Sequence, residues 1–168
     1  MIAGDHSRTA QVAFTYEGPS SVTTPLADGE LRRQIGLKLR AKDSCNVVYV
    51  MWHIEPTQTV VVSVKHTEGA STHAQCGATG YENVRPEASA AAPAIERGIE
   101  HVLRADLDGS ALRVTADGLV VWRGHLPPAA QSFDGPAGLR TDNGVFDVEL
   151  RVPDGRSRST DCARARRE

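Results

Sequence analysis

The sequence predicts an all-β protein, a sandwich of two antiparallel sheets folded as a jelly roll. Three observations lead to this expectation. Hydrophobic residues alternate with polar ones at a period of two, Asp-Gly and Asn-Gly dipeptides separate the alternating segments, and amphipathic helical segments are scarce. An antiparallel sheet with one apolar face needs a second sheet to cover it. At least nine such strands and a long crossover loop suit a jelly roll.

The chain of 168 residues is long enough for one domain of ordinary size. Hydrophobic residues make up 40% and charged residues 24%, a balance typical of a folded globular protein. The net charge of −2 argues against broad electrostatic binding of nucleic acid. We expect one sandwich domain over residues 8–152 and a disordered, Arg-rich tail over residues 153–168, where almost nothing apolar remains.

The first half of the chain contains an opening strand at residues 11–16 and then three strands of an antiparallel meander. Apolar residues alternate with polar ones in residues 31–40, and residues 46–55 are β-branched and aromatic throughout. Residues 59–65 form a Val-rich strand. Turn-forming residues at 42–46 join the first two strands of the meander.

The second half contains five further strands joined by short turns. They cover residues 101–107, 111–116, 119–123, 138–140 and 145–152. Asp108-Gly109 and Asp117-Gly118 are hairpin signals, and residues 141–144 form a third turn. The Ala-rich stretch 87–94 is expected to be a loop because Pro93 interrupts any helix there.

Two segments of this second half carry a more specific pattern. Residues 101–124 read as a strand, a glycine turn, a strand, an Asp-Gly turn and a strand containing Trp122, and residues 135–146 read GPAGLRTDNGVF. Both segments resemble concanavalin A-like lectin and glucanase domains, including laminin-G-like and 3-keto-disaccharide hydrolase-like modules. The resemblance implies a curved jelly roll whose concave sheet commonly binds carbohydrate. This fold hosts lectins, glycosidases, lyases and adhesion modules alike.

The alternation also places polar and aromatic side chains together on one outer sheet face. If Val48, Val50 and Trp52 pack inward, the odd-numbered residues from 49 to 55 face outward. With residues of neighbouring strands they form the candidate ligand-binding set: Gln34, Lys38, Arg40, Tyr49, Met51, His53, Glu55, Lys65 and Glu149. A sugar site needs a flat ring and fixed donors and acceptors. A solvated face of an antiparallel sheet shows the same alternation and is the alternative interpretation.

We therefore expect non-catalytic binding of a carbohydrate or glycoconjugate at the concave sheet, with Tyr49 stacked on the sugar ring. A glycoside hydrolase or lyase acting at the same face is one alternative, with Glu149, Asp147 and Glu55 as its carboxyl groups. The three-acid pattern of jelly-roll glucanases is incomplete in Asp147-Val-Glu149. A structural or protein-interaction module without a small ligand is the other alternative.

No cofactor and no metal is predicted, although calcium stays open. Asp142 and Asn143 offer oxygens of the kind that calcium takes, but Thr-Asp-Asn-Gly also suits a tight turn. A zinc site built from His66, His73 and Cys76 is disfavoured because their spacing is loose and no paired motif frames them.

Cys45 and Cys76 are expected to form a disulfide that leaves Cys162 unpaired. This bridge would close a loop of about thirty residues, stabilise the fold by on the order of 3 kcal/mol, and hold down a segment with little apolar content. The first residues lack the features of a secretory signal, and no apolar run is long enough to span a bilayer. A secreted or periplasmic location is favoured if a leader has been removed, and a cytoplasmic one otherwise.

Overall fold

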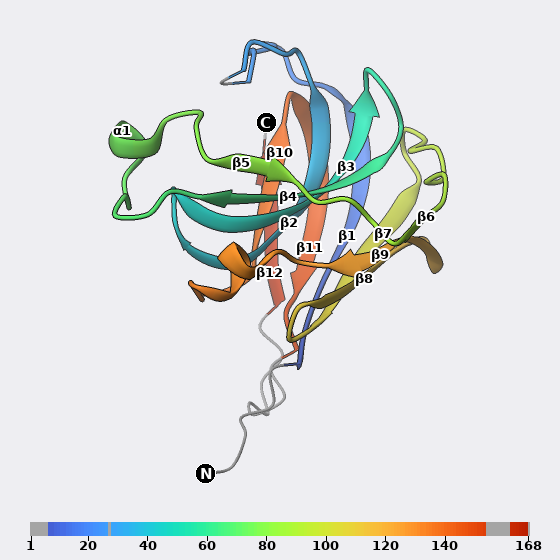
Figure 1. Ribbon diagram of the computed structural model, residues 1–168. Helices are drawn as coiled ribbons and strands as arrows, with labels where there is room; N and C mark the ends of the chain where they lie inside the picture. Colours follow the sequence, from blue (N-terminus) through green and yellow to red (C-terminus); the bar gives the residue numbers. More distant parts are fainter. Residues whose placement is uncertain (1–6, 27, 154–161, 168) are drawn as a thin grey trace.

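The computed structural model describes residues 7–26, 28–153 and 162–167, with side chains for 8–26 and 28–153. Over these ranges the chain forms two antiparallel sheets (Figure 1). One sheet has seven strands in the order β12-β11-β1-β7-β8-β9-β6, and the other has five in the order β10-β2-β3-β4-β5. The predicted all-β, two-sheet antiparallel sandwich is confirmed.

The seven-stranded sheet is built around the long first strand of the chain. Its members are β1 (Ser7–Pro19), β6 (Ala88–Ser89), β7 (Glu100–Asp108), β8 (Ala111–Ala116), β9 (Leu119–His125), β11 (Gly144–Arg151) and β12 (Cys162–Arg167). β1 pairs with β11 on one side and β7 on the other. Asp117 and Gly118 both have positive φ, the backbone conformation that a two-residue hairpin turn between β8 and β9 requires.

The five-stranded sheet contains the predicted meander. Its members are β2 (Arg33–Asp43), β3 (Asn46–Glu55), β4 (Val60–His66), β5 (Tyr81–Asn83) and β10 (Gly138–Asp142). β2 pairs with β3 and β3 with β4, both antiparallel, so the meander is confirmed. The short helix α1 (His73–Cys76) lies between β4 and β5, and the 3-10 helix η1 (Pro128–Gln131) lies between β9 and β10.

The inner faces of the two sheets form the core. The inward residues of β3, among them Val48, Val50 and Trp52, are fully buried, as the alternation predicts. The Trp52 ring lies edge-on to Phe14 of β1 with ring centroids 5.6 Å apart, so it joins the two sheets. Trp122 of β9 is buried as well.

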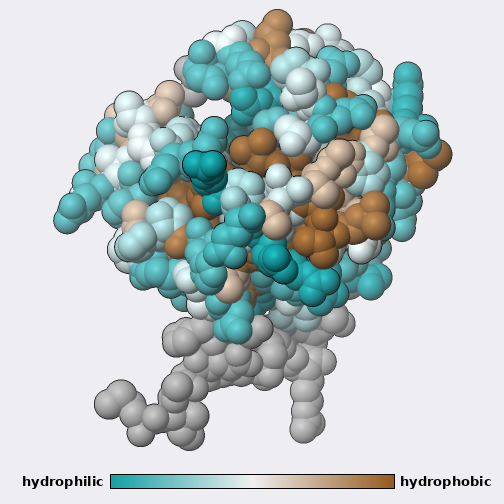
Figure 2. All heavy atoms as spheres, turned by 45° about the vertical axis from the view of Figure 1, so that its right-hand side comes forward, coloured by the Kyte–Doolittle hydropathy of each residue, from teal (hydrophilic) through white to brown (hydrophobic). Residues whose placement is uncertain are grey.

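Apolar side chains also remain on the outside of the sandwich. The exposed large ones are Val22, Leu31, Tyr81, Ile99, Leu119 and Val120. Figure 2 shows one side of the molecule, on which hydrophilic residues predominate and hydrophobic ones form separate patches. No helix in the described part of the chain has the length and apolar character needed to cross a membrane.

The end of the chain differs from the expected disordered tail. β12 pairs antiparallel with β11, from Cys162 opposite Arg151 to Arg167 opposite Phe146. Without β12, β11 would leave a free sheet edge with unpaired backbone groups, a need that composition does not reveal. Residues 162–167 are therefore strand, and residues 154–161 and 168 of the predicted tail lie outside the described residues.

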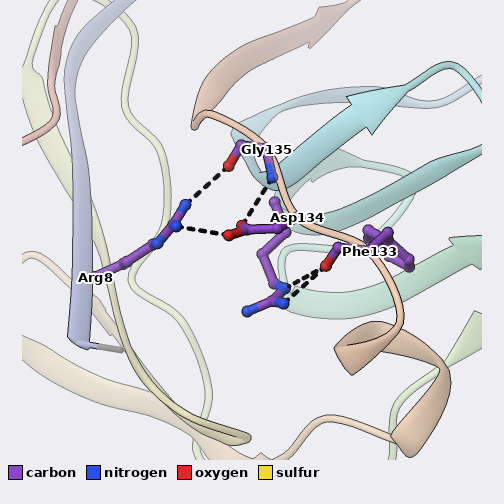
Figure 3. Close-up of polar contacts among 5 residues, drawn as sticks. Arg8, Phe133, Asp134 and Gly135 are labelled. Carbon is purple, nitrogen blue, oxygen red and sulfur yellow. Dashed lines mark hydrogen bonds and ion pairs between the residues drawn. The ribbon is translucent and has the colours of Figure 1, made fainter. Parts of the chain in front are cut away.

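The loop that crosses from one sheet to the other, residues 126–137, is fixed by two arginines. Arg8 of β1 donates to the Asp134 carboxylate (2.8 Å) and to the carbonyl of Gly135 (3.0 Å; Figure 3). Arg40 of β2 donates twice to the carbonyl of Phe133, at 3.0 and 2.7 Å. Arg40 has a φ of 51° and lies in an irregular part of the β2–β3 pairing, so simple alternation fails there. Arg40 was predicted to bind ligand, but its guanidinium contacts the crossover loop.

Candidate functional site

A pocket of about 320 Å³ opens on the outer face of the five-stranded sheet. Strands β2, β3 and β4 form its floor. Residues of the loop 20–32 line one side, and residues of the segment 67–83 line another. This volume lies at the lower end of the range for small-molecule sites.

The side chains on the floor of the pocket are set largely by the alternation of β3. Tyr49, Met51 and His53 point away from the core, and Gln34 lies directly opposite His53 on β2. Gly36 lies opposite Met51, and a Cβ at this glycine would lie 2.1 Å from the carbonyl oxygen of Val50 and 2.6 Å from the Met51 sulfur. Glycine is therefore required for the thioether to lie against the sheet.

Two tyrosines form a stacked pair at the pocket, with a cation at each end. The rings of Tyr49 and Tyr81 are 6.0 Å apart and nearly parallel. Arg140 lies over the Tyr49 ring at 4.8 Å, and the Lys65 ammonium lies over the Tyr81 ring at 4.9 Å. Lys65 also donates to the carbonyl of Gly77 at 2.6 Å, which anchors this end of the stack.

The electrostatics of this stack follow from its burial. Burial, together with the neighbouring Tyr81, raises the pKa of Tyr49 to about 12, although Arg140 acts against this rise. Burial opposes the charge of Arg140, but Asp142 and the two tyrosines outweigh it and raise the pKa of Arg140. At neutral pH the phenol is therefore neutral and the guanidinium is charged.

Asp142 holds two residues of the pocket at once. Its Oδ2 accepts a hydrogen bond from Gln34 Nε2 at 2.7 Å and another from Arg140 Nε at 2.9 Å. Gln34 is almost completely buried, and its Oε1 has no hydrogen-bond partner among the described residues. The buried Nε of Arg32 likewise has no hydrogen-bond partner among the described residues. Polar atoms left in this state are uncommon in folded proteins.

His53 adds an uncharged imidazole beside these groups. The side chain is buried, and burial together with the nearby positive charge of Arg32 lowers the pKa of His53 to about 4. At neutral pH the ring therefore offers one donor and one acceptor.

The structure brings together four of the nine predicted ligand residues: Gln34, Tyr49, Met51 and His53 line the pocket. Lys38 and Lys65 share this face without lining the pocket, and Lys65 lies over the Tyr81 ring at one end of the stack. Glu55 lies at the exposed end of β3 and forms an ion pair with Arg33 at 2.7 Å.

Glu149 and Asp147 require a correction. Both lie on β11, which belongs to the seven-stranded sheet, so they do not share a face with Glu55 or Tyr49. Glu149 pairs with Arg151 at 2.8 Å on that strand. Alternation predicted correctly that the two acids point away from the core, but the sheet to which a strand belongs depends on contacts distant in sequence.

The residues considered for metals have other partners. The side chain of Asn143 exchanges hydrogen bonds with the backbone of Thr24 and donates to the carbonyl of Arg32, and its φ of 60° fits the turn. His66 contacts Asn46 at 2.7 Å. Within the described ranges, no three His, Cys, Asp or Glu side chains are arranged to hold a metal ion.

A disulfide joins Cys45 to Cys76, the pair that the sequence favours, with Cα atoms 5.8 Å apart. Cys45 lies in the turn directly before β3, and Cys76 ends α1 within the segment 67–83. The bridge therefore ties that segment, with its pocket residues Ala78 and Tyr81, to the sheet. Cys162 lies in β12, where side chains are outside the described residues.

The predicted ligand set left out several residues that line the pocket, among them Arg32, Tyr81 and Arg140. Tyr81 follows a polar segment with no periodicity, and its short strand β5 is recognisable only through its pairing with β4. Arg140 lies on a predicted strand, but the pairing of β10 with β2 brings it to the site. The alternation of Arg140 with Asp142 is the local signal that both side chains share a face.

No protein-family model matches this chain, and no curated protein sequence matches it. Solved structures do resemble it. The carbohydrate-binding module CBM66 from Bacillus subtilis has a TM-score of 0.55 and 16% identity, with 88% of this chain and 74% of that chain covered. A functionally unknown protein from Saccharomyces cerevisiae has a TM-score of 0.42 and 16% identity, covering 90% and 72%. This chain shares the sandwich fold of a carbohydrate-binding module.

Proposed function

We propose that this protein binds a carbohydrate without catalysis in the pocket over the five-stranded sheet. The observation that carries the proposal is the combination of a preformed pocket, an exposed tyrosine in a stacked ring pair, and buried hydrogen-bonding groups that have no partner among the described residues. A sugar presents an apolar ring face and several hydroxyls, which match these two kinds of group. The fold shared with a carbohydrate-binding module supports the same assignment.

Tyr81, rather than Tyr49, is the ring that contacts the sugar, through the part of the side chain that Tyr49 and Lys65 leave exposed. Tyr49 is only 8% exposed, whereas Tyr81 is 44% exposed. Lys65 and Tyr49 hold Tyr81 in place before any ligand arrives, so binding loses little side-chain entropy there.

The positions of the carboxylates favour binding over hydrolysis. Glycosidases place two carboxyl groups across the scissile bond, typically within about 10 Å. Asp147 and Glu149 lie on one sheet and Glu55 on the other. Asp28 is the acidic residue that lines the pocket within the described ranges.

Two further features concern the type of sandwich and the location of the protein. The segments 101–124 and 135–146 support a sandwich of concanavalin A-like type. A disulfide is typical of oxidising compartments, so we infer that the protein works outside the cytoplasm, where glycoconjugates are exposed.

A panel of immobilised glycans and isothermal titration calorimetry test the proposal. Wild-type protein is expected to bind at least one saccharide, and Tyr81→Ala is expected to weaken that binding at least tenfold because the exposed ring that contacts the sugar is lost. Leu119→Ala is the matched control, since it truncates an exposed apolar side chain outside the pocket. Equal affinity of Tyr81→Ala and wild type would place the site elsewhere.

A further inference from the structure

The groups left without partners at the pocket indicate the chemistry of the ligand. Gln34 donates through Nε2 to Asp142, while its Oε1 is buried and has no partner among the described residues. A carboxylate only accepts hydrogen bonds, so Asp142 requires the NH₂ end of Gln34 on its side. Asp142 therefore fixes Oε1 as the free end of the amide. This atom is an acceptor, and only a donor on the ligand satisfies it.

Both arginines that line the pocket are paired with carboxylates before any ligand binds. Arg140 pairs with Asp142, and Arg32 pairs with Glu30. Asp28 adds a further carboxylate to the lining, whereas the Lys65 ammonium lies over the Tyr81 ring and does not line the pocket. An acidic sugar would bring one more negative charge near these three acids, and its carboxylate has no proton to donate to Gln34 Oε1.

We propose that the pocket selects an uncharged sugar, one hydroxyl of which donates a hydrogen bond to Gln34 Oε1. This inference rests on the proposed function and names the ligand class of the same site. A neighbouring hydroxyl accepts from Arg32 Nε, a buried donor for which the described residues supply no partner. Both atoms are closed to water in this structure. The unbranched Met51, a diagonal neighbour of Gln34 on the sheet, rotates to admit the ligand.

Calorimetry with defined methyl glycosides tests the charge selection. The probes are the methyl glycosides of glucose, galactose, mannose and fructose, and those of glucuronic and galacturonic acid. Tighter binding of a neutral glycoside than of either acidic one is expected. Tighter binding of an acidic glycoside overturns the inference and leaves saccharide binding in place.

Monodeoxy derivatives of the best-bound neutral glycoside test the role of Gln34. In wild-type protein, one deoxy position should cost at least tenfold in affinity, equal to about 1.4 kcal/mol, because Oε1 then stays unpaired. In Gln34→Met, which keeps the length of the side chain, the same derivative should bind within twofold of the parent glycoside. Gln131→Met makes the same change at an exposed position outside the pocket and should keep the wild-type profile.

The outcomes separate this inference from the proposed function. If the deoxy penalties persist unchanged in Gln34→Met, the inference is overturned although the protein binds sugar. If no glycoside or glycan binds to wild type, the proposed function fails and the inference with it. Circular dichroism checks the fold of Gln34→Met. If that variant does not fold, the wild-type series decides, since a loss confined to one position supports the inference and a uniform profile contradicts it.

Discussion

His53 shows how one residue couples the pocket to the stability of the fold. Its imidazole is buried on the floor beside Arg32, so protonation would place a second cation in a site that water hardly reaches. Burial acts first and the charge of Arg32 second in lowering the pKa of His53 to about 4. The unfolded chain, with an ordinary histidine pKa of about 6.5, takes up this proton at a higher pH than the folded protein.

This difference predicts a loss of stability in acid. The stabilisation is fully present above about pH 6.5 and is lost as the pH falls from 6.5 to 4, because the unfolded state binds more protons in that window. The loss should amount to roughly 3 kcal/mol for this one group. Urea unfolding between pH 4 and 7.5 measures it. His53→Gln should reduce the slope of stability against pH, with His73→Gln as the matched control at an exposed position.

If His53→Gln and wild type lose stability in parallel across this window, the imidazole is not held neutral by burial.

Protonation of His53 should also weaken the binding of a saccharide. Protonated His53 would repel Arg32 and cease to accept a hydrogen bond, so saccharide affinity should fall below pH 5 together with stability.

At the scale of elements, the segment 67–83 depends on its disulfide more than on packing. Most residues of this segment are exposed, whereas Cys76 is buried. The backbone pairing of β5 with β4 covers three residue pairs. The bridge therefore supplies much of what keeps Ala78 and Tyr81 at the pocket.

Removing the bridge should lower both stability and binding. For Cys45→Ala combined with Cys76→Ala, we expect a loss of about 3 kcal/mol in the free energy of unfolding, by the chain-entropy model for a loop of this length. Saccharide affinity should fall because the wall of the pocket is loosened. Denaturation and calorimetry measure both effects. Reductant should bring wild type to the level of the double variant and leave the variant unchanged.

Mass spectrometry of a non-reduced digest checks the premise. A linked pair of peptides carrying Cys45 and Cys76 is expected. Two separate peptides, both of which can be alkylated, would show that Cys45 and Cys76 are not bridged.

Strand faces were predictable from the sequence, whereas the partition of strands between sheets was not. The alternation in β3 correctly buried Trp52 and turned Tyr49 outward, since side chains of a strand point to opposite faces in turn. Nothing local distinguishes β11, with Glu149, from a strand of the other sheet. Its assignment depends on pairing with β1, more than 120 positions away in the sequence.

The candidate site was predictable to the same extent. Residues on the central strands β2 and β3, such as Gln34 and His53, follow from periodicity. Tyr81 and Arg140 reach the pocket on the outer strands β5 and β10, whose neighbours are set by tertiary pairing. The positive φ of Arg40 also breaks the alternation, and an arginine at this position does not predict such a backbone conformation.

On the scale of the whole molecule, the sandwich presents two different outer faces. The five-stranded sheet carries the pocket with the stacked tyrosines. The seven-stranded sheet carries a second pocket of about 290 Å³, lined in part by Asp106, Arg113 and His125. Asp106 there is bound by Arg104 at 3.1 Å, and the described lining contains no Phe, Tyr or Trp. Within the described part of the chain, the first of these two pockets is the one that combines an aromatic ring with buried polar atoms lacking a partner.

An NMR titration distinguishes between these faces directly. Amide resonances of ¹⁵N-labelled protein are followed while the best-bound neutral methyl glycoside is added. Saturable shifts are predicted at Gln34, His53 and Tyr81, on three strands of the five-stranded sheet, with little change around Arg113 on the other sheet. Shifts concentrated around Arg113 and His125, with Gln34 and Tyr81 unmoved, would contradict the assignment of the binding site.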